Sequence, residues 1–345
     1  MKKTLAVAAV LAAFAGSAAA DVTVYGRADV GFNFNGDTNT LTMKTGQSSG
    51  NRWGLMGSEK ISENLTVGFQ LEAGFNVDDG VNATYNATKK TSGNRTFHRE
   101  SRVFVGTEYG TFHFGRMGTL SSGAGSVSIA DNLTVFGTGY GAFSGDMTYI
   151  LDTDTRRDNV VTYQSPKMAG ATVYAQVASD ETEGWAQGSE RYYAAAVEYK
   201  AGAFSAGLVA SVTDGKTAAD AVDNGEHKMQ FVAGVGYDFG VAAVKLTGSF
   251  TDYENAGEDN YGVLLGVSAP VAGGTFDVQV GYGEGYYKVD DVMTKDVERL
   301  SAAAMYQYPL SKKTSLYVGT GYVEEEVAGT KSNKAEYFAG MLHKF

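Results

Sequence analysis

Side chains near the start of the chain alternate between an apolar and a polar set. From Val22 to Phe34, the even-numbered positions carry Val, Gly, Ala and Phe, whereas the odd-numbered positions carry Thr, Tyr, Arg, Asp, Gly and Asn. Successive side chains of a β-strand point to opposite faces, so this segment is predicted to be a strand with one apolar and one polar face. The alternation recurs along the chain, and the last segment places on one face Tyr337, Ala339, Met341, His343 and Phe345. This pattern is typical of a closed barrel, although alternation alone does not say which face meets water and which meets lipid.

Residues 1–20 have the features of a secretory signal peptide. Lys2 and Lys3 precede an apolar run that begins at Leu5, and three alanines lead to Asp21. Such a segment is cleaved, so we expect residues 1–20 to be removed and residues 21–345 to form one domain. The apolar run is shorter than the roughly 18 residues that a membrane-spanning helix needs. No later apolar stretch is that long, so a membrane location would require strands.

Polar stretches divide the mature chain into hairpins. Eight of them are long and lie at 35–49, 76–97, 116–156, 179–190, 213–227, 252–260, 283–297 and 323–334. Seven short breaks alternate with them, at 59–64, 108–110, 165–170, 200–203, 239–242, 269–274 and 309–313. Because each long loop joins two strands, the sequence predicts an all-β fold, a 16-stranded antiparallel transmembrane β-barrel in up-and-down order.

Composition and charge support a barrel with a wet interior. The chain has 45 Gly, 21 Tyr and 18 Phe but no Cys, which excludes a disulfide scaffold. Its formal charge is −11, or −13 without the two lysines of the signal peptide, and this acidity argues against a nucleic-acid partner. Charged residues such as Arg27, Glu72 and Lys245 share the polar face of their strands. Arg on the lipid face at mid-membrane would cost roughly 2–4 kcal/mol, so the charged face is predicted to line the lumen.

Catalytic motifs are missing from the sequence. None of the four histidines is followed two residues later by a Ser or adjoins an Asp, and neither G-x-S-x-G nor H-E-x-x-H occurs. The chain is therefore predicted not to be an enzyme, and no cofactor is required.

Several short motifs resemble those of general diffusion porins of Gram-negative outer membranes, in particular the alphaproteobacterial trimeric porins. In chain order they are VYGRA at 24–28, RWGLMGSE at 52–59, SRVFVGTEYG at 101–110, FHFGR at 112–116, NVVTYQSP at 159–166 and GMLHKF at 340–345. The resemblance implies an outer-membrane channel for passive diffusion of ions and small hydrophilic solutes. It also implies that the third external loop, for which 116–156 is the candidate, folds into the lumen and narrows it to a charged eyelet.

In this family a basic cluster on the barrel wall faces acidic groups on that loop. Carried over by position, the basic wall consists of Arg27, Arg52, Arg102 and the pair Arg156 and Arg157. Counting back by twos from Gln164 selects Arg156 as the member of the pair that faces the lumen. The loop offers the acids Asp131, Asp146, Asp152 and Asp154, and which of them face the arginines is left open. Loop acidity favours cations and the arginines favour anions, so the sign of selectivity is also open.

Partners follow from the resemblance as well. It implies a homotrimer embedded in outer-membrane lipid, with a C-terminal signal for the barrel assembly machinery at Tyr337 and Phe345. Paired loop acids could supply oxygen ligands for calcium, at Asp78 and Asp79, at Asp152 and Asp154, or at Asp290 and Asp291. Solvated loop acids are the simpler interpretation of each pair. Two alternatives on the same barrel are a sugar-specific channel, which needs an aromatic track in the lumen, and an adhesin that binds through its loops.

Overall fold

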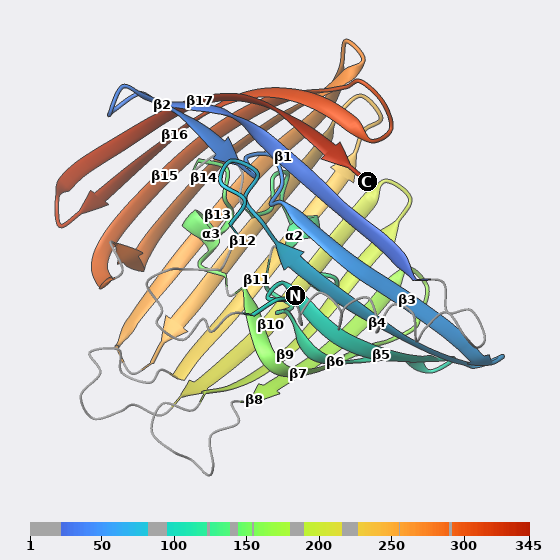
Figure 1. Ribbon diagram of the computed structural model, residues 1–345. Coiled ribbons are helices and arrows are strands. Elements are labelled where there is room, and N and C mark those ends of the chain that lie inside the picture. Colours follow the sequence, from blue (N-terminus) through green and yellow to red (C-terminus); the bar gives the residue numbers. More distant parts are fainter. Residues whose placement is uncertain are drawn as a thin grey trace.

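The computed structural model is one antiparallel β-sheet that closes on itself (Figure 1). It describes residues 22–81, 95–122, 125–138, 144–153, 155–179, 190–215, 227–254, 256–289 and 292–345, so the predicted signal peptide lies outside the described residues. Closure joins the first strand to the last, with Phe32 opposite Ala339. The final residue takes part, because Gly26 N donates to Phe345 O at 3.2 Å and Phe345 N donates to Gly26 O at 3.1 Å.

The strands follow one another around the barrel in chain order. They are β1 (Thr23–Asn35), β2 (Thr40–Thr45), β3 (Arg52–Ser62), β4 (Leu65–Gly74), β5 (Glu100–Thr107), β6 (Gly110–Gly118), β7 (Arg156–Gln164), β8 (Ala171–Ser179), β9 (Glu190–Ala201), β10 (Phe204–Gly215), β11 (His227–Asp238), β12 (Ala243–Tyr253), β13 (Glu258–Val271), β14 (Gly274–Val289), β15 (Val292–Pro309), β16 (Thr314–Val327) and β17 (Thr330–Lys344). Because β2 and β3 pair with successive parts of β1, they share one place in the sheet. The barrel therefore has 16 strand positions, as predicted.

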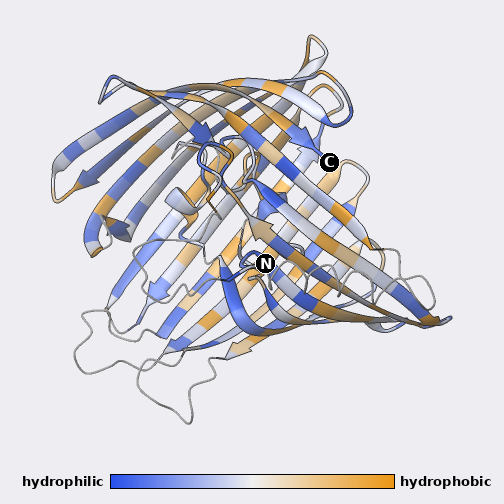
Figure 2. Ribbon diagram, viewed as in Figure 1, coloured by the Kyte–Doolittle hydropathy of each residue, from blue (hydrophilic) through white to orange (hydrophobic). Residues whose placement is uncertain are grey.

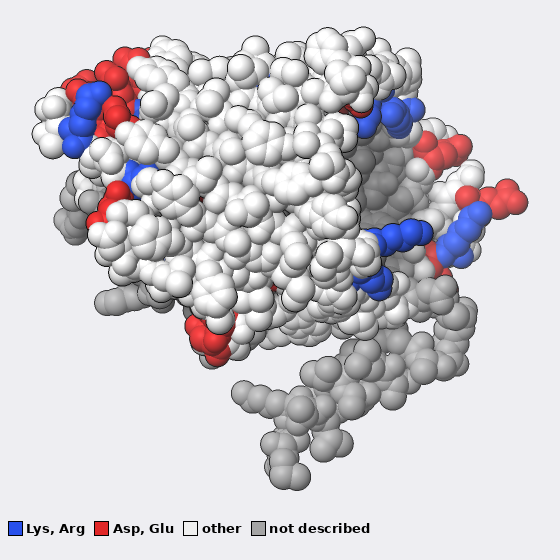
Figure 3. All heavy atoms as spheres, turned by 90° about the horizontal axis from the view of Figure 1, so that it is seen from above, with Lys and Arg blue, Asp and Glu red and all other residues white. Residues whose placement is uncertain are grey.

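Alternation along each strand separates a polar interior from an apolar exterior. Leu246 and Val263 are 47% and 43% exposed on the outer face, whereas their neighbours Thr247 and Leu264 are buried on the inner one. Figure 2 shows the resulting alternation of hydrophobic and hydrophilic bands along the strands. In the view of Figure 3, charged side chains gather mainly at the two ends of the barrel, with a broad uncharged band between them. This is the surface that a lipid bilayer requires of a spanning barrel.

Three predicted loops are wrong in part. Residues 40–45 pair with β1 as a strand, although they were assigned to the loop 35–49. The stretches 283–297 and 323–334 are mostly strand, since β14 pairs with β15 up to Val289 and Val292, and β16 pairs with β17 up to Val327 and Thr330. Polar residues occupy both faces of these strand ends, so alternation is lost while the ladder of backbone hydrogen bonds continues.

The segment between β6 and β7 holds the two short helices α2 (Ala130–Leu133) and α3 (Thr148–Leu151). Leu133 and Ile150 belong to an apolar cluster with Val209, Val232 and Leu264 of the strands β10, β11 and β13. Both helices therefore pack on the inner face of the same half of the barrel. Among the described helices, none is long and apolar enough to cross a membrane.

Candidate functional site

Arginines gather on β1, β3 and β5, with β4 lying between the last two. Arg27 and Arg52 are register partners across β1 and β3, so their side chains leave the sheet on the same face. Arg27 Nη1 donates to Ser49 Oγ at 2.5 Å, and Arg52 Nε donates to the carbonyl of Gly50 at 3.0 Å. The two positive charges are thus held next to each other on the inner wall. A nearby carboxylate or a bound anion is needed to offset their repulsion.

Glu72 supplies that carboxylate. Its Oε1 lies 2.7 Å from Arg99 Nε and 3.9 Å from Arg52 Nη1, and its Oε2 accepts a hydrogen bond from Tyr25 OH at 3.0 Å. The side chain of Glu72 is nearly inaccessible, so its charge is shared by the two arginines above it. Sequence reasoning missed Arg99, because it precedes β5 and lies beyond the reach of the alternation.

Arg102 is buried in the wall. Its Nη2 donates to Gln70 Oε1 at 2.7 Å, its Nε lies 3.3 Å from Glu100 Oε2, and Nη1 contacts His113 Nδ1. The side chains of Arg102 and Glu100 are 8% and 1% exposed. Glu100 shares the strand parity of Arg102, so the sequence pattern could have identified it. A charge satisfied in this way stabilises the wall and is only slightly accessible to a solute.

A β-bulge changes the assignment of Arg156 and Arg157. Gly115 pairs with Val160, but Met117 pairs with Arg157, so the register shifts between them, at Asn159 with φ 54°. Counting by twos across this shift is therefore invalid. The sequence analysis selects Arg156 over Arg157 as the lumen-facing residue on that count, so the count gives no reason to exclude Arg157 from the inner wall. The guanidinium of Arg157 stacks 4.8 Å from the ring centroid of the buried Tyr192 and donates to Thr213 Oγ1 at 3.3 Å.

Arg156 has different neighbours. The charges that act on it are those of Arg99, Glu100, Glu72 and Arg116, which places it with the group around β4 and β5. The two arginines thus extend the basic wall in two directions along the inner face. Glu100 and Glu72 partly balance this charge.

The loop acids separate into two groups. Asp146 accepts hydrogen bonds from Thr148 N and Oγ1 at 2.8 and 2.7 Å, which fixes the start of α3. Asp152 Oδ2 lies 2.9 Å from Lys228 Nζ and accepts from Tyr253 OH, so it is paired with the wall of β11 and β12. Asp154 lies outside the described residues. Asp131 as a whole residue is exposed, but its carboxyl group is partly shielded from water by the surrounding protein, and the charges of Lys245, Arg52 and Arg27 act on it.

Among the described loop acids, Asp131 is thus the one whose carboxyl group lies within the electrostatic influence of Lys245 first, and then of Arg52 and Arg27. Desolvation by the surrounding protein raises the pKa of its carboxyl group, while Lys245, Arg52 and Arg27 oppose that rise. Close to the same wall, His98 has its pKa lowered to about 4 by burial and by the positive charges of Arg99, Arg156 and Arg116. Its imidazole is neutral at pH 7, so it adds no positive charge there.

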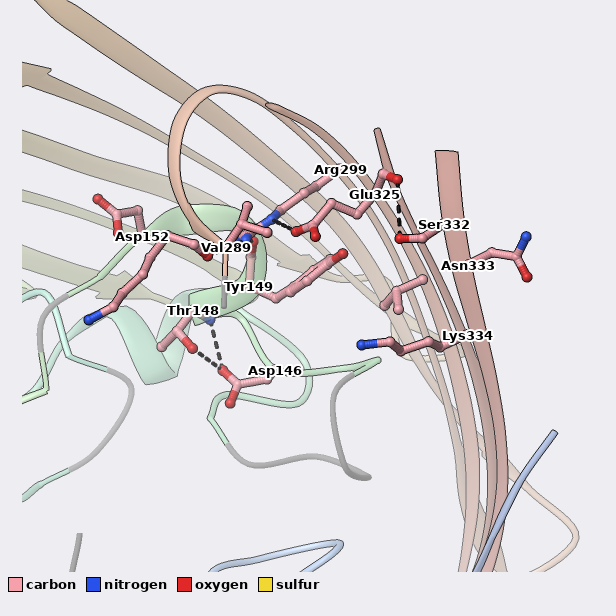
Figure 4. A pocket seen from close by; sticks show the side chains of 12 residues that line it. Asp146, Thr148, Tyr149, Asp152, Val289, Arg299, Glu325, Ser332, Asn333 and Lys334 are labelled. Atoms are coloured by element: carbon pink, nitrogen blue, oxygen red, sulfur yellow. Dashed lines mark hydrogen bonds and ion pairs between the residues drawn. The ribbon is translucent and has the colours of Figure 1, made fainter. Parts of the chain in front are cut away.

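A cavity of about 430 Å³ lies between α3 and the strands β14 to β17 (Figure 4). Arg299 lines one side of the cavity. Its Nε lies 2.8 Å from Glu325 Oε2, and its Nη1 donates a hydrogen bond to the carbonyl of Tyr149 at 3.1 Å. Burial raises the pKa of Tyr149 to about 12, so the ring beside this guanidinium stays neutral at pH 7. Arg299 joins the loop to β15, and Ser144, whose Oγ donates to Glu336 Oε1 at 2.5 Å, joins it to β17.

The remaining predicted residues are placed as follows. The aromatic track that a sugar-specific channel needs would draw on inward-facing tyrosines, but Tyr174 and Tyr192 are buried and Tyr25 is hydrogen-bonded to Glu72, so these three do not form an open track. Tyr337 is exposed on the outer face, and its ring centroid lies 6.4 Å from that of Phe34. Among the described residues, no three metal-ligating side chains stand together. Asp290 and Asp291 lie outside the described part of the chain, so calcium binding stays a prediction.

Comparisons with known proteins agree on one family. A profile described as "Gram-negative porin" matches residues 6–328. An outer membrane porin protein of Bordetella pertussis is 27% identical with both chains fully covered, and outer membrane porin protein 32 of Delftia acidovorans is 29% identical with 97% of this chain and 93% of the relative covered. Among solved structures, an anion-selective porin from Comamonas acidovorans has a TM-score of 0.77 at 23% identity, covering 95% of this chain and 100% of that one. OmpT of Vibrio cholerae has a TM-score of 0.66 at 16% identity, covering 94% and 97%.

Proposed function

Because the chain belongs to the Gram-negative porin family and is an outer-membrane β-barrel, we propose that it is a passive diffusion channel for ions and small hydrophilic solutes and not an enzyme. The observation that carries this proposal is the separation of faces, with exposed Leu246 and Val263 outside and buried Thr247 and Gln279 inside. A barrel of 16 strands with polar inner side chains is wide enough to hold an aqueous path. A solute that passes through the channel therefore exchanges part of its hydration water for contacts with polar groups of the wall.

The segment 116–156 is the proposed constriction. Support comes from the packing of Leu133 and Ile150 against inner-face side chains of β10, β11 and β13. A segment that occupies part of the interior leaves a narrower path along the opposite wall, which carries Arg27 and Arg52. Asp131 is the proposed acidic partner of these two arginines across the path, because their charges act on its carboxyl group. Asp146 and Asp152 instead hold the segment in shape.

Anion preference is the proposed sign of selectivity. The inner wall of β1 to β7 carries Arg27, Arg52, Arg99, Arg102, Arg156 and Arg157, and the carboxylates of Asp29, Glu72 and Glu100 balance only part of this charge. A narrow path beside excess positive charge lowers the energy of an anion more than that of a cation. One similar solved structure is described as an anion-selective porin, which agrees with this sign.

Assembly is proposed in the form that the resemblance implies. The barrel is a homotrimer of the alphaproteobacterial porin type, and Tyr337 and Phe345 form its signal for the barrel assembly machinery. Phe345 is suited to that role because its backbone closes the sheet while its side chain stays half exposed. A native mass of one chain would contradict the trimer.

The deciding experiment is single-channel recording of the purified mature protein in a planar lipid bilayer. We expect stepwise, long-lived conductance that closes in thirds, and a reversal potential of the anion sign under a salt gradient. A correctly folded protein that produces no steps would overturn the channel, and a reversal potential of the cation sign would overturn only the proposed selectivity.

A further inference from the structure

A set of glycines on the inner face of β10 to β16 faces the described parts of the segment 129–152, which are residues 129–138 and 144–152. Their positions alternate with exposed outer residues, so their missing side chains would point inward. We call this surface the glycine seat, and it consists of Gly207, Gly234, Gly262, Gly266, Gly281, Gly283 and Gly321. Glycine costs a strand stability relative to Ala, so a group of them on one face calls for a packing reason.

The packing reason is the close approach of the loop backbone. A Cβ atom at Gly262 would collide with the carbonyl oxygen of Ile150, and one at Gly234 would lie 2.9 Å from Leu133 Cβ. At Gly266 the collision would be with Val135 Cγ2. None of these positions has a positive φ that would by itself require glycine. Close contact with the segment is thus the constraint at five of these glycines, whereas at Gly281 and Gly283 the nearest atoms belong to wall side chains and Ile150 comes within 2.9 and 3.3 Å.

Side chains around the seat donate hydrogen bonds to the carbonyl groups of the segment. Tyr287 OH donates to Ile150 O at 2.7 Å, and Lys245 Nζ donates to Thr134 O at 2.7 Å. The other donors pair with other carbonyls: Thr247 with Leu133, Gln279 with Gly145, Arg299 with Tyr149, and Gln230 with Asp152. Buried carbonyls need such partners, and these contacts depend on backbone and not on loop side chains.

We propose that the glycine seat and its donors form a preformed docking surface that recognises the backbone of segment 129–152 and thereby sets the width of the pore. The inference rests on the proposed function, because it assigns to this surface the placement of the constriction. The glycines let the backbone of the segment approach the barrel wall closely, and the hydrogen-bond donors fix its distance from the wall. The glycines are positioning residues that do not touch the solute, and one added methyl group lifts the segment toward the wall of Arg27 and Arg52.

The test compares two glycines on neighbouring strands. In Gly262→Ala the new Cβ meets a backbone oxygen, which no change of side-chain rotamer relieves. In the control Gly248→Ala the nearest atom to the new Cβ is Gly262 O at 3.6 Å, an ordinary contact. We expect Gly262→Ala to lower the single-channel conductance by roughly half, because conductance follows the cross-section of the narrowest part, and Gly248→Ala to leave it unchanged.

A rescue experiment separates docking from general damage to the strand. Gly266→Ala should also lower the conductance, and adding Val135→Ala should restore it, since the substitution removes the Cγ2 atom that the new methyl group strikes. A strand that was merely weakened by Ala would not recover. Resistance of the folded barrel to heat in detergent is measured for each variant, which identifies any that fail to fold.

The outcomes for the two proposals differ. Wild-type protein that forms no channel contradicts the proposed function itself. Channels of unchanged conductance in both folded variants, Gly262→Ala and Gly266→Ala, overturn the glycine seat and leave the porin function intact. Failure of Val135→Ala to rescue also overturns the seat, because the loss would then arise within the strand.

Discussion

Tyr149 makes two contacts with Arg299: its ring centroid lies 4.5 Å from the guanidinium carbon, and its carbonyl oxygen accepts a hydrogen bond from Nη1 at 3.1 Å. The arginine belongs to β15 and the tyrosine to the short helix α3, so one side chain joins the barrel wall to the proposed constriction. The ring centroid of Tyr287 also lies 4.5 Å from the guanidinium carbon of Arg299. Cation–π contacts and hydrogen bonds with this geometry immobilise both partners.

Replacing Arg299 by Met should make the constriction mobile. The substitution removes the hydrogen bond to Tyr149 and leaves Glu325 without its ion-pair partner, so we expect brief closures and greater open-channel noise in single-channel recordings. A matched control is Lys295→Met on the same strand, because the Lys295 side chain is 59% exposed and its ion pair with Glu258 is of the surface type that contributes about 0–1 kcal/mol. Equal noise in the two variants would argue against the role of Arg299.

Arg52 and Arg102 should affect different properties when each is changed to Ala. Arg52 stands with Arg27 on the inner wall, so Arg52→Ala should shift the reversal potential toward cations and barely change stability. Arg102→Ala leaves Glu100 buried without its partner, which typically costs about 3–5 kcal/mol. Reversal potentials and urea unfolding in lipid vesicles measure the two effects. The assignment of roles fails if the effects are exchanged.

Selectivity should depend on pH through Asp131. Because the pKa of this carboxyl group is raised, it gains a proton at a higher pH than an ordinary Asp as the solution is acidified. Protonation removes a negative charge that opposes those of Lys245, Arg52 and Arg27, so the anion preference should increase on acidification. His98, with a pKa of about 4, stays neutral until the solution is strongly acidic.

The control for this pH dependence is Asp131→Asn, which lacks the titrating group. Its reversal potential should resemble that of the acidified wild-type protein and stay constant above about pH 5, where His98 is neutral. A wild-type reversal potential that moves no more on acidification than that of Asp131→Asn would contradict the proposed placement of Asp131.

An arginine placed on the outer face should destabilise the barrel more, the nearer it lies to the middle of the membrane. Val263 is exposed in the middle of β13, so Val263→Arg should destabilise the barrel in vesicles by roughly 2–4 kcal/mol. Val292 is exposed at the end of β15, where the cost of Arg falls to about 0–1 kcal/mol. Unfolding by urea provides the comparison, and equal costs would show that the uncharged band is not the lipid contact.

The fold could be predicted from the sequence wherever a strand separates lipid from water, because that boundary imposes alternation. Beyond the apolar band both faces are wet, so Glu324, Glu325 and Glu326 resemble a loop although they continue β16. The candidate site was predictable on regular strands, as at Arg27, Arg52 and Arg102. It was not predictable at Arg157, where a bulge ends the count by twos, or at Arg99, which precedes its strand.

The direct pairing of β1 with β17 determines when this protein can fold. Contacts between the two ends of the chain, such as Arg27 with Lys344, cannot form until the last residues have been synthesised and exported. Until then the sheet has two open edges, which present unpaired backbone groups to any other chain. Joining ends so far apart in sequence also makes folding slow. A chain that lacks either end therefore cannot complete its hydrogen-bond ladder, and both edges stay open until β17 meets β1.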